Sequence, residues 1–240
     1  MTWGSFGTVH LVSLAFAALL LVGLYFLLRR MPPRAAHILL SILSFLGIAA
    51  ILYNLLAWGS PLEYLPLHLC SLNALVLPAA VITRSERLGN LLLLWSLGAL
   101  FALIANFAMA EAVIPSWTFA FYYFPHILEF GIPLLLLKLG RLKVSVRHIP
   151  FTIVVTMAAY TLIHLINVSL NGYAALNGLL NSAGTLLQVN YMFSVTPENP
   201  LLTFFWSIIP YPYWYMYMAV PIIALYLALL CGIARLVRRK

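Results

Sequence analysis

The sequence predicts an all-α protein, a polytopic membrane helix bundle of about seven transmembrane helices with its N-terminus outside and its C-terminus cytoplasmic. The composition, the length of the apolar stretches and the distribution of positive charge lead to this fold class. Of the 240 residues, 64% are hydrophobic and 8% are charged, which leaves too little polar surface to cover a water-soluble globule. We expect one transmembrane domain over residues 1–240.

Several stretches of the chain approach the roughly 20 mostly apolar residues that a transmembrane helix needs. The first has no positively charged leader and is long enough to span, so we expect a membrane helix rather than a cleaved signal peptide. The third is the weakest by length, and we count it because the basic cluster after it would otherwise face the wrong side. The expected spans are residues 8–28, 36–57, 65–82, 89–110, 117–138, 149–170 and 214–236.

The 13 Lys and Arg residues occur in four clusters, at every second break between the apolar stretches. Short loops rich in Lys and Arg stay on the cytoplasmic side of a membrane, which gives the orientation. No polar domain accompanies the clusters, so we expect them to contact anionic inner-leaflet headgroups and no nucleic acid. The clusters are Arg29, Arg30 and Arg34; Arg84 and Arg87; Lys138, Arg141, Lys143 and Arg147; and Arg235, Arg238, Arg239 and Lys240.

The breaks on the outer side carry no Lys or Arg and fall at residues 59–64, 111–116 and 171–213. The last is a long outer loop that begins rich in Asn and Gly and becomes aromatic, as in Pro210-Tyr211-Pro212-Tyr213-Trp214-Tyr215. Trp and Tyr at such density favour the membrane–water interface. The loop therefore fits either an aromatic belt or a lid over a cavity.

The polar side chains within the expected spans gather in the outer half or the middle of the membrane. Glu129 is the one acidic residue inside an expected span. An ionisable side chain is costly to place inside a membrane, so we treat Glu129 as a functional candidate. His37 and His148 lie beside basic clusters and are expected at the interface. The remaining polar candidates at outer or middle depth are His10, His68, Cys70, His126 and His164.

Cys70 and His126 could form a nucleophile and its base. A thiolate is a strong nucleophile and a good leaving group in acyl transfer, but a thiol in an apolar site needs a neighbouring base. His68 would point about 200° away from Cys70 on one helix, so the base must come from another helix. Expected depths of ~8 Å for Cys70 and ~13 Å for His126 allow their side chains to meet. Glu129 follows His126 by three residues and could fix the imidazole tautomer.

Three alternatives compete with this catalytic interpretation. A buried cysteine is often only a small apolar filler. His10, His68, His126 and His164, with Cys70 or Glu129, could instead bind Zn²⁺, although no pair of these histidines has the i, i+4 spacing of a helical zinc motif. The polar outer pocket could also belong to a permease, a receptor or an assembly partner that binds a small ligand.

If the protein is an enzyme, the side-chain amide of Asn73 or Asn190 could donate a hydrogen bond to the oxyanion of the reaction.

Several strings of the sequence resemble the YwaF family of bacterial integral membrane proteins. The most specific is Leu65-Pro66-Leu67-His68-Leu69-Cys70-Ser71. The others are the opening Phe6-Gly7-Thr8-Val9-His10-Leu11, His126 with a following apolar run that contains Pro133, and Asn190-Tyr191-Met192-Phe193 before Pro197. The agreement in order, spacing and hydropathy extends over essentially the whole chain.

This resemblance implies a multi-pass protein of a bacterial plasma membrane. The family is similar to a eukaryotic membrane protein that acts as a cysteine-dependent acyltransferase of ether phospholipids. More distantly, it resembles androgen-induced membrane hydrolases that cleave fatty esters with a Thr and a His. Carried over to this sequence, the resemblance implies that Cys70 is the nucleophile and His126 the base, and that His10 and His68 lie in the pocket. We expect a phospholipid substrate, no cofactor, and further substrate contacts from Asn73, His164, Asn190 and Tyr191.

Overall fold

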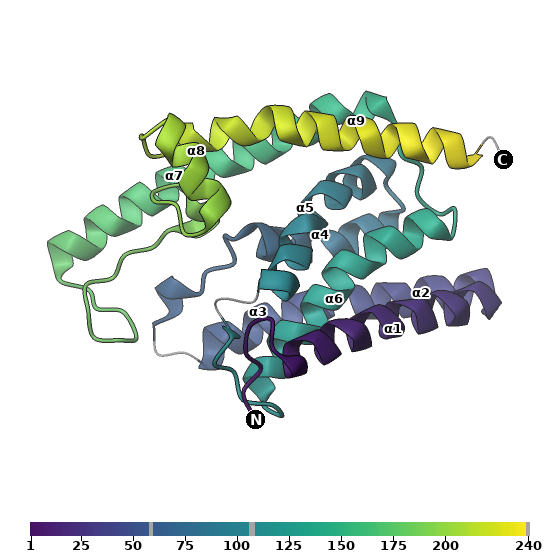
Figure 1. Ribbon diagram of the computed structural model, residues 1–240, viewed down its shortest axis with the longest axis horizontal. Coiled ribbons are helices and arrows are strands. Elements are labelled where there is room, and N and C mark those ends of the chain that lie inside the picture. The colour runs from purple at the N-terminus through teal and green to yellow at the C-terminus, as the bar shows by residue number, and fades with distance from the viewer. Residues whose placement is uncertain (58–59, 106–108, 239–240) are drawn as a thin grey trace. The chain divides into compact units, whose positions relative to one another are not determined.

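The computed structural model describes residues 1–57, 60–105 and 109–238, with side chains through Ala234, and this part of the chain forms helices and no β-strand (Figure 1). The expected all-α class is therefore confirmed. Some predicted features lie outside the described residues. These are Gly59 of the first outer connection, residues 106–108 of the fourth expected span, and Arg239 and Lys240 of the last basic cluster.

Within the described residues, six helical segments are long and apolar enough to cross a membrane. Two of them include a neighbouring 3-10 turn, and one is formed by α2 and α3 together. The helices involved are α1 (Thr8–Arg30), α2 (Pro33–Ser44), α3 (Leu46–Ala57), α5 (Glu86–Ala105), α6 (Trp117–Lys138), α7 (Ile149–Asn177) and α9 (Ala219–Arg238).

The expected span at residues 65–82 is the exception. Helix α4 covers Leu69–Thr83 and has 15 residues, fewer than the roughly 20 that cross a bilayer. The chain before α4 is a tight turn rather than a helix, because the Leu67 N–H group bonds to the Leu65 carbonyl at 2.7 Å. Cys70 therefore lies in the first turn of a short apolar helix, closer to the helix end than the sequence predicted.

The long outer loop expected at residues 171–213 is partly helical. Helix α7 continues past residue 170 to Asn177, and Gly178 ends it with a left-handed φ of 60°. Helix α8 (Pro200–Ile208) begins where the Asn199 side chain accepts a hydrogen bond from the Leu202 N–H group. Asn171 and Asn177 therefore lie within α7, and Gly178 supplies its left-handed cap.

The chain folds into two compact units, and the first contains Met1–Tyr53 and Leu69–Lys143. At its centre α5 packs against α4 and α6, and Leu91 to Trp95 of α5 are buried. Helices α1 and α2 also contact α6, as Figure 1 shows. The N-terminal segment is anchored by Trp3, which is buried and donates from Nε1 to Ser13 Oγ at 2.8 Å.

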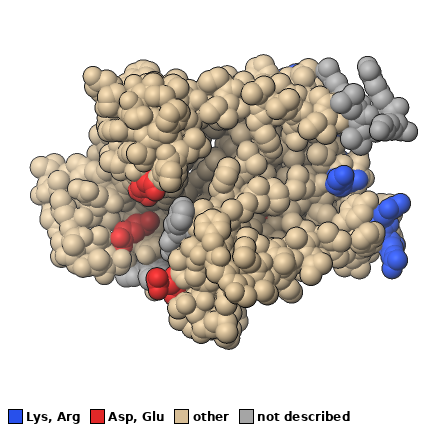
Figure 2. Space-filling model, viewed as in Figure 1, with Lys and Arg blue, Asp and Glu red and all other residues tan. Residues whose placement is uncertain are grey.

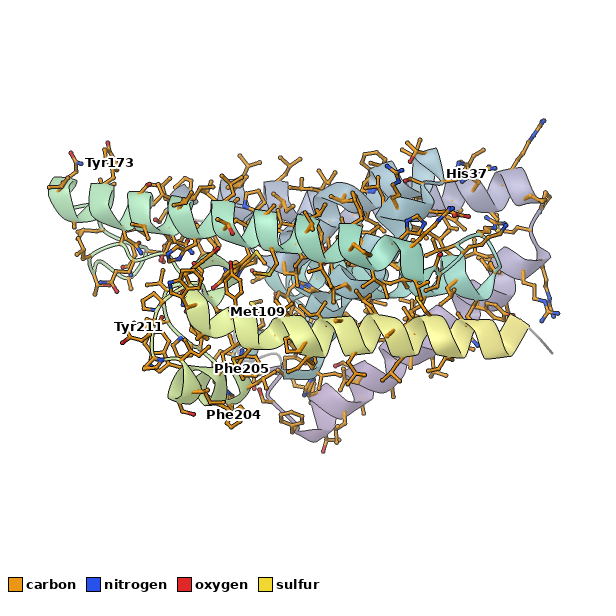
Figure 3. The ribbon with its side chains drawn as sticks, turned by 90° about the horizontal axis from the view of Figure 1, so that it is seen from above. His37, Met109, Tyr173, Phe204, Phe205 and Tyr211 are labelled. Atoms are coloured by element: carbon orange, nitrogen blue, oxygen red, sulfur yellow. The ribbon has the colours of Figure 1, made fainter. Side chains whose placement is uncertain are left out.

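The second unit contains Asn54–His68 and Val144–Lys240. Helix α9 packs against α7, and the 3-10 turn η4 (Tyr191–Phe193) also contacts α7. Helix α8 packs against the turn η5 (Trp214–Met218), with Phe205 and Tyr215 buried between them. Phe204, the neighbour of Phe205 on α8, is exposed (Figure 3).

The spanning helices present large apolar side chains on their surfaces. On α1, Leu11, Phe16, Leu19 and Phe26 are all exposed. Most of the face visible in Figure 2 is neither acidic nor basic. Such a surface is stable in the hydrocarbon of a bilayer, where each helix satisfies its own backbone hydrogen bonds. The protein is therefore a multi-pass integral membrane protein.

Candidate functional site

Cys70 lies at the N-terminal end of α4 and is partly buried. Helix α5 approaches this end closely at Gly98, where an added Cβ would lie 3.6 Å from the backbone nitrogen of Cys70. The first N–H groups of a helix have no partner within the helix, and they give this end a partial positive charge. The N–H groups at this helix end are therefore available to a neighbouring oxyanion.

His126 is buried on α6 and has a defined tautomer. Its Nδ1 lies 2.6 Å from the carbonyl oxygen of Tyr122, one helical turn earlier. Because a carbonyl can only accept, Nδ1 carries the hydrogen and Nε2 carries the lone pair. From the sequence we expected Glu129 to fix this tautomer, whereas the group that accepts the hydrogen bond from His126 is the main-chain carbonyl of Tyr122.

Tyr122 is a site residue that the sequence motifs did not single out. Its ring lies 4.3 Å from the His126 ring between centroids, and its hydroxyl donates to the Ala102 carbonyl of α5 at 3.0 Å. These contacts hold the backbone and ring that flank the imidazole. The signal was present in the sequence, because residues four apart on a helix share a face.

The same face of α6 is directed toward Cys70. Tyr122, His126 and Glu129 are spaced i, i+4 and i+7, which aligns them along one side of a helix. The Cys70 thiol lies within electrostatic range of both Glu129 and Tyr122, the two residues that flank His126 on this face. The fold thus brings Cys70, His126 and Glu129 into one region of the first unit.

Asn73 and Glu129 add unsatisfied acceptors to this region. Asn73 Nδ2 donates to the main-chain oxygen of Glu129 at 3.1 Å, and both residues are buried. In the described part of the chain, Asn73 Oδ1 and Glu129 Oε2 have no hydrogen-bond partner. A buried acceptor without a donor is costly, so these two oxygens mark a place where a hydrogen-bond donor would be stabilised.

His10 belongs to the first unit, but both of its ring nitrogens are engaged. The Phe6 N–H group donates to Nδ1 at 2.9 Å, and Nε2 donates to the Leu103 carbonyl at 2.8 Å. The ring also lies edge to face with Trp3. This geometry gives His10 a positioning role between the N-terminal segment and α5.

His164 lies in the second unit, in a polar network on α7. Its Nδ1 lies 3.0 Å from Ser194 Oγ. The Asn167 amide donates to Ser194 Oγ and to the Tyr191 carbonyl, at 2.8 Å each. Asn167 and Ser194 were not predicted as site residues, although Asn167 lies three residues after His164 and hence on the same helix face.

His68, Tyr191 and Asn190 also lie in the second unit. The ring of His68 packs against Tyr191, with 5.4 Å between centroids. The Tyr191 hydroxyl donates to the Leu62 carbonyl, and burial raises the pKa of Tyr191 to about 12, so this hydroxyl stays neutral. The Asn190 amide donates to Thr196 and Glu198 and organises its own loop.

The predicted residues therefore form two groups, each within one unit. The first unit holds Cys70, Asn73, His126 and Glu129, with His10 as a support, and the second holds His68, His164, Asn190 and Tyr191. In the described ranges, no three His, Cys, Asp or Glu side chains converge on a possible metal position. Cys70 and Cys231 form no disulfide.

Comparison with known proteins gives one family. The model of the TMEM164 family matches residues 5–230. A comparison with curated proteins and one with solved structures each gave no match.

Proposed function

This chain belongs to the TMEM164 family of membrane proteins, and we propose that it is a lipid acyltransferase or lipid ester hydrolase embedded in the membrane. In this proposal Cys70 is the nucleophile and His126 is the base, in the outer half of the bilayer. The substrate is a phospholipid whose acyl ester reaches the first turn of α4.

The observation that carries the proposal is the hydrogen bond from His126 Nδ1 to the Tyr122 carbonyl. A general base needs a lone pair on the nitrogen that faces its nucleophile, and a fixed tautomer supplies it. Nε2 of His126 carries such a lone pair, and Tyr122 and Glu129, which share a face of α6 with His126, interact electrostatically with Cys70.

The reaction proceeds in two halves. Nε2 of His126 takes the proton of the Cys70 thiol as Sγ attacks the ester carbonyl, and the carbon–oxygen bond of the ester breaks. His126 returns that proton to the departing alkoxide, which leaves as a lysolipid while the acyl group remains as a thioester. A hydroxyl of a second lipid, or water, then attacks the thioester carbonyl, and the carbon–sulfur bond breaks to release a new ester or a free fatty acid. The proton of the attacking hydroxyl or water passes through His126 to Sγ, which restores the thiol.

The oxyanion of each half-reaction needs hydrogen-bond donors. The first-turn amides of α4 suit this role, because they belong to the same helix end as Cys70. Asn73 lies one turn further on α4, but its amide already donates to the Glu129 carbonyl. The side-chain acceptors of Asn73 and Glu129 suit the binding of a lipid hydroxyl, which is a donor.

Turnover in reconstituted vesicles tests the proposal. Wild type, Cys70→Ala and Cys231→Ala are supplied with a phospholipid carrying a labelled acyl chain and with an unlabelled lysophospholipid acceptor. We expect wild type and Cys231→Ala to release labelled fatty acid or to move the label to the acceptor, and Cys70→Ala to do neither. Cys231 is the matched control because it is the other cysteine of the chain.

Equal turnover by Cys70→Ala and wild type would show that the nucleophile is misassigned. If wild-type vesicles yield neither product, the catalytic proposal fails and a non-catalytic ligand-binding function takes its place. Label on the acceptor identifies a transferase, and labelled free fatty acid identifies a hydrolase.

A further inference from the structure

A cavity of about 290 Å³ lies at the end of the first unit where α4 and α6 terminate and α2 and α5 begin. His37 of α2, which is labelled in Figure 3, lines it. Arg84 from the turn between α4 and α5 and Arg141 from the segment after α6 also line it. Three chain segments that are far apart in sequence therefore contribute basic groups to one cavity. None of these residues belongs to the proposed acyl-transfer site.

The described lining of the cavity includes basic side chains and no Asp or Glu. Both guanidinium groups act electrostatically on His37, which places all three side chains in one electrostatic neighbourhood. Within residues 1–57, 60–105 and 109–234, neither Arg84 nor Arg141 has a carboxylate partner in an ion pair. Guanidinium groups are planar donors whose geometry matches the oxygens of phosphate.

The backbone reinforces the preference for an anion. Arg84 has a φ of 53° directly after α4, and its N–H group bonds to the Val81 carbonyl, so this turn fixes where the side chain begins. Ser85, which also lines the cavity, caps α5 by accepting from the Leu88 N–H group at 3.3 Å. Pro33, the first residue of α2, lines it as well. Two helix N-termini thus border the cavity, and Glu86 in the first turn of α5 offsets part of the positive charge of one of them.

Apolar side chains also line the cavity. Val81, Leu136 and Leu142 contribute to it, and each comes from the end of a helix or from a segment next to one. A cavity lined by both cationic and apolar side chains matches a molecule that carries a phosphate on a hydrocarbon body. By the distribution of Lys and Arg, this end of the protein faces the cytoplasm.

We propose that this cavity is a binding site for a phosphate group, supplied by an anionic phospholipid of the inner leaflet. The site has no part in the acyl-transfer chemistry proposed for Cys70 and His126, and either proposal can fail without the other. A lipid bound here would tie α2, the α4–α5 turn and the end of α6 together.

Native mass spectrometry of the detergent-solubilised full chain tests the site. The probes are short-chain phosphatidic acid, phosphatidylcholine with the same acyl chains, and inorganic phosphate. The variants are Arg84→Asn, which tolerates a left-handed φ, and Arg141→Gln. Arg29→Gln is the matched control, since Arg29 is exposed at the end of α1 and does not line the cavity.

We expect phosphatidic acid to bind more tightly than phosphatidylcholine, and each cavity variant to weaken it about tenfold, the effect of losing a hydrogen bond to a charged group. Arg29→Gln should bind like wild type. Competition by inorganic phosphate would identify the phosphate alone as sufficient, and lack of competition would identify the lipid as the ligand. Equal binding by wild type and both cavity variants, or an equal loss in Arg29→Gln, would overturn the proposal.

Discussion

The two buried histidines of the first unit are held in opposite tautomers by main-chain groups. His10 accepts at Nδ1 and donates from Nε2, which uses both nitrogens. His126 donates from Nδ1 to the Tyr122 carbonyl, and the structure gives its Nε2 no partner among the described residues. The same side chain therefore serves as a structural link in one place and as a candidate base in the other.

Substitution of His126 tests this difference at the residue scale. We expect His126→Ala to lower the rate of lipid turnover by about 10²- to 10⁴-fold, the usual contribution of a general base. Tyr122→Phe should retain most of the turnover, because the Tyr122 carbonyl still accepts the hydrogen bond from His126 and only the contact with Ala102 is lost. The measurement is the initial rate per folded protein in vesicles.

A large loss of turnover in Tyr122→Phe, together with wild-type turnover in His126→Ala, would show that His126 is not the base and that the Tyr122 hydroxyl is needed. His10→Ala provides the structural contrast. We expect it to lower the yield of folded protein and to leave the turnover of the folded fraction close to that of wild type.

At the scale of elements, α3, α4 and α6 meet at Gly47. A Cβ at this position would lie 2.6 Å from the Cβ of Ala74 and 2.7 Å from Oε1 of Glu129. Glycine is therefore required for the approach of α3 to the region that holds Asn73 and Glu129. Close helix approach at small residues is a common means of association in membranes, where lipid provides no hydrophobic drive.

Gly47→Ala tests this packing. We expect it to destabilise the protein by about 1–3 kcal/mol, as overpacking of a core commonly does, and to lower the midpoint of thermal unfolding in detergent. Gly23→Ala is the matched control, since a Cβ added at Gly23 of α1 would have no described atom within 4 Å. If both variants unfold at the wild-type temperature, α3 does not pack as described.

At the scale of the whole molecule, hydropathy predicted the spanning helices well, with α4 as the exception. Helix α4 begins only after a tight turn at Leu65–Leu67, and a hydropathy window does not register such a turn. The polar residues were predicted by depth, which follows from their position along each span. Their lateral neighbours depend on packing between helices, so the sequence did not separate Cys70 and His126 in the first unit from His68 and His164 in the second.

The cavity lined by His37, Arg84 and Arg141 is a second case in which the sequence predicted the membrane face of the residues but not their neighbours. The sequence indicated that Arg84 and Arg141 share a membrane face, because both belong to positive clusters. It did not indicate that they line one cavity with His37, since α2, the α4–α5 turn and the end of α6 are brought together only by the fold.

Selective labelling of the two cysteines tests whether Cys70 is the reactive nucleophile. Wild type, Cys70→Ala and Cys231→Ala are treated in membranes with a lipid-like thiol-reactive probe, and the modified residue is identified by mass spectrometry. We expect equal labelling of wild type and Cys231→Ala, located at Cys70, and no labelling of Cys70→Ala. Labelling of Cys70→Ala as strong as that of wild type would contradict the assignment of Cys70 as the nucleophile.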